Sequence, residues 1–190
     1  MNTAFRQFGA ALALGFGVAA NADTIQVANA ELEVAETRYA LHADFRLDLG
    51  ASLLEALNNG LSLGFLVEFE LSRPRWYWFN EKTATEKLEL RLAYLPLPQH
   101  YRLSSGTLHQ NFASLSEALQ ALGRIHGWPV LERDRVDNGQ RYIAAVRMRL
   151  DPAQLPRPFR VSAVTNREWT LTSDWKRFPF VPLAPVQEAR

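Results

Sequence analysis

Apolar and polar residues alternate along most of the chain, and this pattern predicts β-strands that each bury one face. Successive side chains of a strand point to opposite faces of its sheet, so alternating apolar residues share the buried face. The alternation occurs in two runs between Ile25 and Leu49, separated by a turn at Glu36-Thr37. It continues through residues 65–72, 88–94, 101–112, 128–135, 140–150, 159–163 and 169–175.

The turn residues between these segments predict how the strands connect. Asp137-Asn138-Gly139 predicts a hairpin between segments 128–135 and 140–150, because Asn-Gly readily adopts positive φ. Pro74 interrupts the strand of residues 65–72, which indicates an edge position or a bulge, since proline cannot donate to a strand ladder. Pro96 and Pro98 predict a corner before the strand that starts near Tyr101 and runs toward Phe112.

Two short segments have helical rather than strand spacing. Ser52 to Glu55 and Ser114 to Glu117 have the spacing of capping boxes, each followed by an apolar stripe. Asn59-Gly60 and Gly127 are the predicted stops. Residues 39–57 and 101–119 match at several positions with a constant offset, which raises the hypothesis of an internal duplication.

These elements predict one α+β domain over residues 23–177. Its strands are expected to be mostly antiparallel, in a curved sheet or a sandwich, with two short amphipathic helices packed on it. Residues 178–190 form a proline-rich tail with Pro179, Pro182 and Pro185 in every third position. That spacing aligns the prolines on one side of a polyproline II helix, although an extended terminus also fits.

The first 22 residues have the three parts of a secretory signal peptide. Arg6 is their only charge, an apolar stretch runs from Phe8 to Ala20, and Ala20-Asn21-Ala22 is a small-x-small cleavage site. A spanning helix needs about 20 apolar residues, and this stretch is shorter and interrupted by glycine. We therefore expect cleavage after Ala22 and a periplasmic mature chain without a transmembrane span, rather than a membrane anchor.

Charge and cysteine content narrow the function further. The 21 basic and 20 acidic residues give a net charge of +1, and removal of Arg6 with the signal reduces this to zero. A neutral domain has no electrostatic reason to bind nucleic acid. The chain has no cysteine, so disulfides cannot stabilise it and a packed aromatic core must do so.

No arrangement of residues in the sequence predicts catalysis, a cofactor or a metal. The histidines His42, His100, His109 and His126 are scattered, without the spacing of metal ligands. The nucleophile-elbow, phosphate-loop, dinucleotide and zinc-protease motifs are absent from the sequence. Ser104-Ser105-Gly106 is the place where a triad of distant residues would be sought, although an ordinary loop fits it better.

The most unusual stretch combines arginines with aromatic rings. It contains Arg73, Arg75, Trp76, Tyr77 and Trp78. Rings and guanidinium planes of this kind form stacking platforms for a sugar, a peptide or a protein partner. The alternative is structural: the tryptophans anchor the core while the arginines pair with Glu68 or Glu70 across the sheet.

Several ordered motifs resemble one family. They are Arg73-x-Arg75-Trp76-Tyr77-Trp78, Leu92-x-Tyr94 with Tyr101, Leu150-Asp151 with Leu155-Pro156-x-Pro158, and Trp169-x-Leu171-x-Ser173-x-Trp175. Together they resemble the proteobacterial domain of unknown function 4390, also labelled proline-rich signal peptide protein, over nearly the whole mature chain. The resemblance implies no activity, cofactor or catalytic residue. The genes of that family often lie beside one for a nitrogen-regulation-type membrane sensor kinase, which implies a periplasmic partner of that kind.

The sequence thus favours a non-enzymatic periplasmic interaction module, accessory to a membrane sensor kinase or another envelope protein. The candidate contact residues are Arg73, Arg75, Trp76, Tyr77, Trp78, Leu155, Pro156 and Pro158. Two alternatives stay open at this point. An envelope hydrolase acting on cell-wall or lipid material requires a polar cleft, and a carrier of an apolar ligand requires an enclosed cavity.

Overall fold

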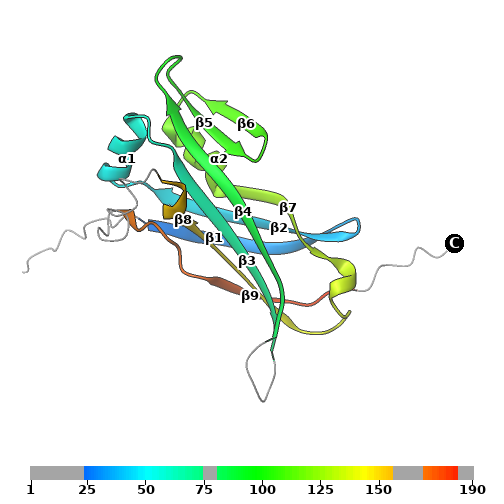
Figure 1. Ribbon diagram of the computed structural model, residues 1–190. Helices are drawn as coiled ribbons and strands as arrows, with labels where there is room; N and C mark the ends of the chain where they lie inside the picture. The colour runs from blue at the N-terminus through cyan, green and yellow to red at the C-terminus, as the bar shows by residue number, and fades with distance from the viewer. Residues whose placement is uncertain (1–23, 75–80, 156–168, 184–190) are drawn as a thin grey trace, which may run out of the picture.

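The computed structural model describes residues 24–74, 81–155 and 169–183, which fold into two antiparallel sheets with two α-helices (Figure 1). The three-stranded sheet has the order β1-β2-β7 and the six-stranded sheet the order β6-β5-β4-β3-β8-β9. The strands are β1 Thr24–Ala35, β2 Arg38–Asp48, β3 Leu63–Arg73, β4 Glu81–Leu95, β5 His100–Ser105, β6 Leu108–Phe112, β7 Arg124–Glu132, β8 Tyr142–Leu150 and β9 Lys176–Phe180. The helices are α1 Ala51–Asn58 and α2 Leu115–Gly123, with short 3-10 turns η1 Arg133–Arg135 and η2 Pro152–Gln154.

The two sheets pack face to face around one apolar core. The alternating residues of β3 supply its centre, and the fully buried ones are Leu63, Phe65, Val67, Phe69 and Leu71. Each such side chain stabilises the fold by about 1.5–3 kcal/mol relative to an exposed one. Tyr39 of β2 meets Phe180 of β9 edge to face, with ring centroids 4.9 Å apart, which joins the two layers. The predicted α+β class with mostly antiparallel strands is therefore confirmed.

The strand pattern is confirmed for β1, β2, β3, β4 and β8. Glu36 adopts φ +49° in the turn between β1 and β2, and residues 96–99 turn the chain between β4 and β5. In β8 the alternating residues Tyr142, Ala144, Val146, Met148 and Leu150 are all buried, as their spacing predicts.

Three predicted connections are wrong. Residues 101–112 form two strands, β5 and β6, because Gly106 turns the chain at φ +56°. The segments on either side of Asp137-Asn138-Gly139 do not form a hairpin, since β7 lies in the three-stranded sheet and β8 in the six-stranded one. Pro74 is not at an edge: β3 lies between β4 and β8, and the proline follows its last residue, Arg73. The predicted alternative, a bulge, has a counterpart between Leu71 and Ser72, where the pairing of β3 with β4 shifts register.

The internal duplication stays a hypothesis. In each half a hairpin, β1–β2 or β5–β6, precedes the helix, and a strand of the other sheet, β3 or β7, follows it. At the constant offset, however, the single strand β2 corresponds to residues 100–110, which comprise β5, a turn and the start of β6, so the strand bounds do not coincide.

Only one of the two predicted helix starts has its serine at the N-cap position. Ser114 is the N-cap of α2, and its side chain accepts a hydrogen bond from the Glu117 amide at 3.3 Å. In α1 the N-cap is Gly50, so the helix begins before Ser52 and the predicted box there is wrong. The end of α1 at Asn59-Gly60 is confirmed, with Gly60 at φ +87°.

Helix α2 ends four residues before the predicted stop at Gly127. It ends at Gly123, where a Cβ atom would collide with the carbonyl oxygen of Phe45, so β2 lies directly against the helix end. The chain enters β7 at once, and Ile125, predicted as helical, is a buried strand residue. Gly127, at φ +69°, lies where the pairing of β2 with β7 shifts register.

The last strand differs from the pattern expected at the end of the chain. Trp169 and Leu171 are buried, but β9 starts only at Lys176, with Trp175 half-buried just before it. The strand passes the predicted boundary at residue 177 and includes Pro179, which is tolerated because β9 is the last strand of the described sheet. The predicted strand at 159–163 lies outside the described residues. No helix in the described ranges is long and apolar enough to cross a membrane.

Candidate functional site

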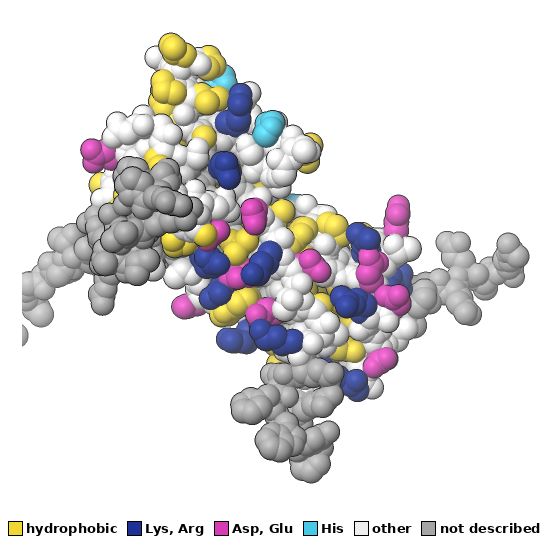
Figure 2. Space-filling view, viewed as in Figure 1, with side chains coloured by type: hydrophobic (Ala, Val, Ile, Leu, Met, Phe, Trp, Pro, Cys, Tyr) yellow, Lys and Arg dark blue, Asp and Glu magenta, His cyan; other side chains and the backbone are white. Residues whose placement is uncertain are grey.

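The outer face of the six-stranded sheet, which points away from the three-stranded sheet, carries a dense set of charges. Alternation places Glu68 and Glu70 of β3 on this face, together with Arg147 and Arg149 of β8. Figure 2 shows basic and acidic side chains interspersed across the middle of this face. Because Glu68 pairs with Arg147 in the register of the two strands, opposite charges lie directly across from each other.

Glu68 is the centre of this charge arrangement. Its side chain is 13% exposed and accepts hydrogen bonds from Nε of Arg147 at 2.6 Å and from Nε of Arg149 at 3.3 Å. Burial alone raises the pKa of the Glu68 carboxyl, but the hydrogen bonds and positive charges of the two arginines outweigh it and hold the pKa below its ordinary value. The carboxylate therefore stays charged and keeps both arginines in place.

A chain of polar contacts continues from Arg149 toward β4. Arg149 contacts Asp151 at 3.4 Å, and the amide of Gln154 donates to the same carboxylate at 3.4 Å. The Gln154 oxygen then accepts from Arg91 at 3.5 Å, a long and weak contact. Gln154 can lie over β3 there because Gly64 has no side chain: a Cβ atom at Gly64 would collide with it.

At its other end the chain of contacts reaches an aromatic ring. The guanidinium carbon of Arg147 lies 4.5 Å from the ring centroid of Trp175, within the range of a cation–π interaction. We call the connected set the polar network. It comprises Trp175, Arg147, Glu68, Arg149, Asp151, Gln154 and Arg91.

A hollow lies at each end of the polar network. The first, the Trp175 hollow, has a volume of about 380 Å³ and lies over the small side chain of Ala145 on β8. Its walls include three basic side chains and one acidic one, and its lining residues are Glu70, Ser72, Lys82, Ile143, Ala145, Arg147, Trp175 and Arg177. Glu70 is paired with Lys82 at 2.9 Å, whereas Arg177 has no ion pair in the described part of the chain.

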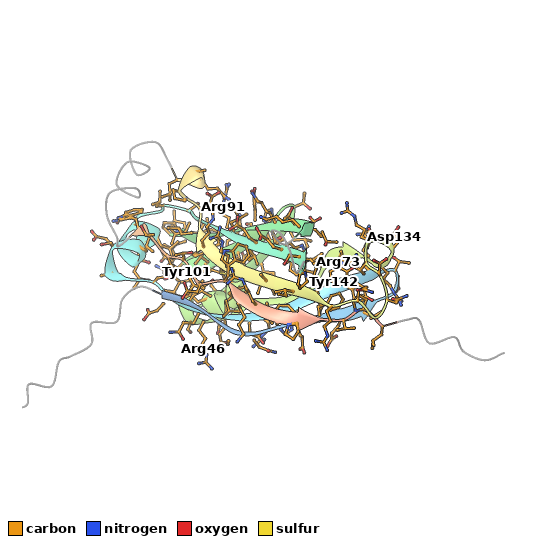
Figure 3. All side chains as sticks on the ribbon, turned by 90° about the horizontal axis from the view of Figure 1, so that it is seen from below. Arg46, Arg73, Arg91, Tyr101, Asp134 and Tyr142 are labelled. Carbon is orange, nitrogen blue, oxygen red and sulfur yellow. The ribbon has the colours of Figure 1, made fainter. Side chains whose placement is uncertain are left out.

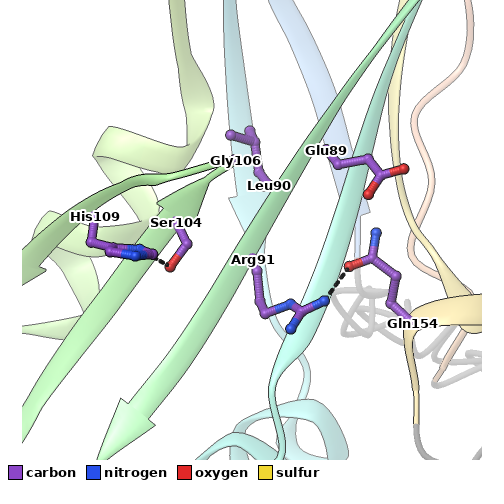
Figure 4. Close-up of a pocket in the computed structure, with 7 residues that line it drawn as sticks. All are labelled: Glu89, Leu90, Arg91, Ser104, Gly106, His109 and Gln154. Atoms are coloured by element: carbon purple, nitrogen blue, oxygen red, sulfur yellow. Dashed lines mark hydrogen bonds between the residues drawn. The ribbon is translucent and has the colours of Figure 1, made fainter.

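The second, the Arg91 hollow, has a volume of about 280 Å³ and lies between β4, the hairpin of β5 and β6, and η2 (Figure 4). Its lining residues are Glu89, Leu90, Arg91, Ser104, Gly106, His109 and Gln154. Figure 4 shows the Ser104–His109 pair on one side of the hollow and the Arg91–Gln154 pair on the other. Neither hollow is an enclosed cavity of the kind that a carrier of an apolar ligand needs.

Ser104 and His109 are the residue types of a nucleophile and its base, and they lie 3.0 Å apart between Oγ and Nδ1. Catalysis by such a pair needs a third group that orients the imidazole, commonly a carboxylate. Within the described ranges no carboxylate is bonded to His109, and both partners lie on an open surface. The arrangement fixes the direction of the His109 ring and does not form a triad.

The predicted contact residues fall in three places. Arg73 ends β3 and pairs with Asp137 at 3.4 Å, not with Glu68 or Glu70 as its sequence position suggested. Leu155 is 1% exposed, so its side chain belongs to the core. The remaining predicted contact residues are Arg75, Trp76, Tyr77, Trp78, Pro156 and Pro158, and they lie outside the described residues.

Two histidines that the sequence left scattered meet on the opposite sheet. The rings of His42 on β2 and His126 on β7 have centroids 5.3 Å apart. His42 contacts Glu33 at 3.5 Å and His126 contacts Asp44 at 3.1 Å. Among the residues that the structure describes, no group of three or more such side chains is arranged to hold a metal ion. His100 of β5 pairs with Leu95 of β4.

Sequence reasoning missed Arg91, Gln154 and Trp175 as members of one site. The outward position of Arg147 and Arg149 was a usable signal, because Glu68 and Glu70 alternate in the same way on β3. Nothing in the sequence states that β3 and β8 are neighbours, however, since about 80 residues separate their paired positions and the connection crosses both sheets.

The fold and this face define a two-layer β-sandwich with a solvent-facing network of fixed charges on one sheet. The chain belongs to the family described as Domain of unknown function (DUF4390), whose model matches residues 22–179. The resemblance drawn from the sequence motifs is thereby confirmed. No curated protein and no solved structure matches the chain.

Proposed function

We propose that the chain is an exported, non-enzymatic interaction module that binds a partner protein in the periplasm through the outer face of the six-stranded sheet. The observation that carries this proposal is the polar network, which fixes arginines and an aromatic ring in place between two open hollows. Arginine and tryptophan are the residues that contribute most to protein interfaces. A surface whose side chains are already ordered loses less conformational entropy on binding.

The charge of the Trp175 hollow favours an acidic segment of the partner. Lys82, Arg147 and Arg177 face one carboxylate, Glu70, and two of the three cations are already paired within the face. Arg177 has no ion-pair partner among the described residues, so a carboxylate of a bound segment would neutralise its charge. The small side chain of Ala145 leaves room for an extended backbone over β8.

The proposed partner is a periplasmic segment of a membrane sensor kinase. The gene neighbourhood implied by the family supports this choice, and the signal peptide at residues 1–22 supports a meeting in the periplasm. The mature domain would then modulate the sensor from outside the cytoplasmic membrane and would need no catalytic residue of its own.

Photo-crosslinking in intact cells tests this proposal. A photoreactive amino acid at position 143, in the lining of the Trp175 hollow, is compared with one at position 46. Arg46 and Arg91 lie on opposite sides of the two layers (Figure 3). We expect a crosslink to the sensor from position 143 and none from position 46, and the charge-reversing changes Lys82→Glu and Arg177→Glu should abolish it. Equal crosslinking from both positions, or no capture of the sensor from position 143, would contradict the proposal.

A further inference from the structure

The Arg91 hollow is built on one row of residues that crosses four neighbouring strands. Gly64 of β3 pairs with Arg91 of β4, Arg91 with Ser104 of β5, and Ser104 with His109 of β6. Directly opposed residues share a face of the sheet, so three polar side chains stand side by side. Gln154 of η2 takes the place above Gly64, where a side chain would otherwise be.

Arg91 is a cation without a neutralising partner in this row. Its only hydrogen bond among the described residues is the 3.5 Å contact with the uncharged Gln154 oxygen, and no carboxylate of those residues lies within ion-pair distance. The remaining guanidinium N–H groups are free to bind a planar anion. A carboxylate fits this group best, because two parallel N–H donors match its two oxygens.

The Ser104–His109 pair adds directed hydrogen-bonding groups next to Arg91. The bond between Ser104 Oγ and His109 Nδ1 occupies one ring nitrogen and leaves the other without a partner in the described part of the chain. Because the pair holds the His109 ring in one direction, a ligand binding there does not have to order that ring.

Glu89 gives the hollow a second, opposite charge. It lies two residues before Arg91 on the same face of β4 and lines the hollow, yet no ion pair joins it to Arg91. Glu89 would repel a multiply charged anion such as phosphate, whereas a ligand that carries an ammonium group next to its carboxylate satisfies both side chains. The volume of about 280 Å³ limits the ligand to a small molecule.

We propose that the Arg91 hollow binds a small zwitterion of the amino acid or dipeptide class. Arg91 holds the carboxylate, and Glu89 holds the ammonium group. The Ser104–His109 pair donates one hydrogen bond to the carboxylate, from His109 Nε2 when Ser104 donates to Nδ1, or from Ser104 Oγ when Nδ1 carries the hydrogen. This site lies at the far end of the polar network from the Trp175 hollow, and its occupancy does not depend on the protein partner proposed above.

Titration of the purified mature protein, followed by amide NMR spectra, tests the proposal. The probes are L-alanine, L-alanyl-L-alanine, acetate and inorganic phosphate. We expect alanine and the dipeptide to shift the amide signals of Ser104, Gly106 and His109 saturably, with dissociation constants in the millimolar range. Phosphate should leave these signals unchanged, and acetate should bind at least about tenfold more weakly than alanine, a difference of about 1.4 kcal/mol.

Two variants assign the roles of the charged residues, and a third is the matched control. Arg91→Gln should weaken binding of alanine at least tenfold. Glu89→Gln should weaken binding of alanine but strengthen binding of acetate, because the carboxylate that repels an anion is gone. Lys87→Gln removes a charge from the same face of β4 without touching the hollow and should change neither. Unshifted amide signals elsewhere in each variant show that the fold is intact. The absence of saturable shifts at about 100 mM alanine, or undiminished binding by Arg91→Gln, would overturn the proposal.

Discussion

Glu68 shows how a single carboxylate organises one face of this protein. It lies in the middle of the six-stranded sheet, largely buried, and its Oε2 atom contacts Arg147 and Arg149 of β8. Removing it would leave Arg147 and Arg149, themselves only about one-third exposed, without their main counter-charge. The charges of the polar network are therefore mutually dependent, and the loss of one carboxylate loosens several residues.

The pH dependence of stability provides a measurement of this dependence. The folded-state pKa of Glu68 is below its ordinary value of 4.5, so its contribution to stability is fully present above that pH and is lost as pH falls through the lower, folded-state pKa. We expect Glu68→Gln to lower the free energy of unfolding at pH 7 by about 1–3 kcal/mol. Urea denaturation at pH 7 and pH 3 should show a smaller loss on acidification for the variant than for the wild type.

Glu70 provides the matched control for this experiment. It lies two residues further along β3, and its partner Lys82 is 65% exposed, so solvent screens the pair. Glu70→Gln should change the free energy of unfolding by less than about 1 kcal/mol. Equal losses in the free energy of unfolding from the two substitutions would show that the contacts with Arg147 and Arg149 add nothing to the contribution of Glu68.

At the scale of the elements, the two helices differ in how their first turns are satisfied. Helix α2 starts with the Ser114 side chain bonded to the Glu117 amide, whereas α1 starts at Gly50 without a side-chain cap. Ser114→Ala leaves this amide without its partner, and we expect a loss of about 0.5–2 kcal/mol in the free energy of unfolding. Ser114→Asp retains an acceptor and places a negative charge at the helix N-terminus, so it should restore stability. Thermal denaturation of the two variants tests this expectation. Equal losses of stability in both would show that the side-chain acceptor at position 114 contributes nothing.

The elements also show where sequence reasoning succeeds and where it stops. The buried faces of β3 and β8 follow from alternation alone, because one buried face is enough to impose a period of two. The end of α2 could not be predicted in this way, since it is determined by the close approach of Phe45, a residue 78 positions earlier. Similarly, Asn138-Gly139 has the chemistry of a hairpin turn, but the chain there passes from one sheet to the other.

The candidate site was harder to predict than the fold for the same reason. Each member of the polar network has an ordinary sequence context, as Arg91 and Gln154 show. Their significance comes from strand register and from the missing side chain at Gly64, which lets Gln154 reach Arg91. Alternation assigns a residue to a face, but it does not tell which strands are neighbours on that face.

For the whole molecule, the start of the domain and the expected cleavage site fall together. The first strand begins at Thr24, which pairs with Asp48. The three-stranded sheet therefore starts at the second residue of the chain that is expected after cleavage. Removal of residues 1–22 would therefore leave every pair of β1 with β2 intact. We expect mass spectrometry of the protein from the periplasmic fraction to give the mass of residues 23–190.

Substitutions at the cleavage site test this expectation against the alternative of a membrane anchor. Signal peptidase requires small residues on either side of one variable residue. Ala22→Phe should accordingly block processing and leave a full-length, membrane-attached precursor, while Asn21→Gln, at the variable position, should be processed normally. Because the cut lies outside β1, the processed Asn21→Gln protein should unfold at the same temperature as the wild type. Recovery of wild-type protein in the cytosol with Met1 still attached would show that the domain acts in the cytoplasm, where a periplasmic segment of a sensor cannot reach the polar network.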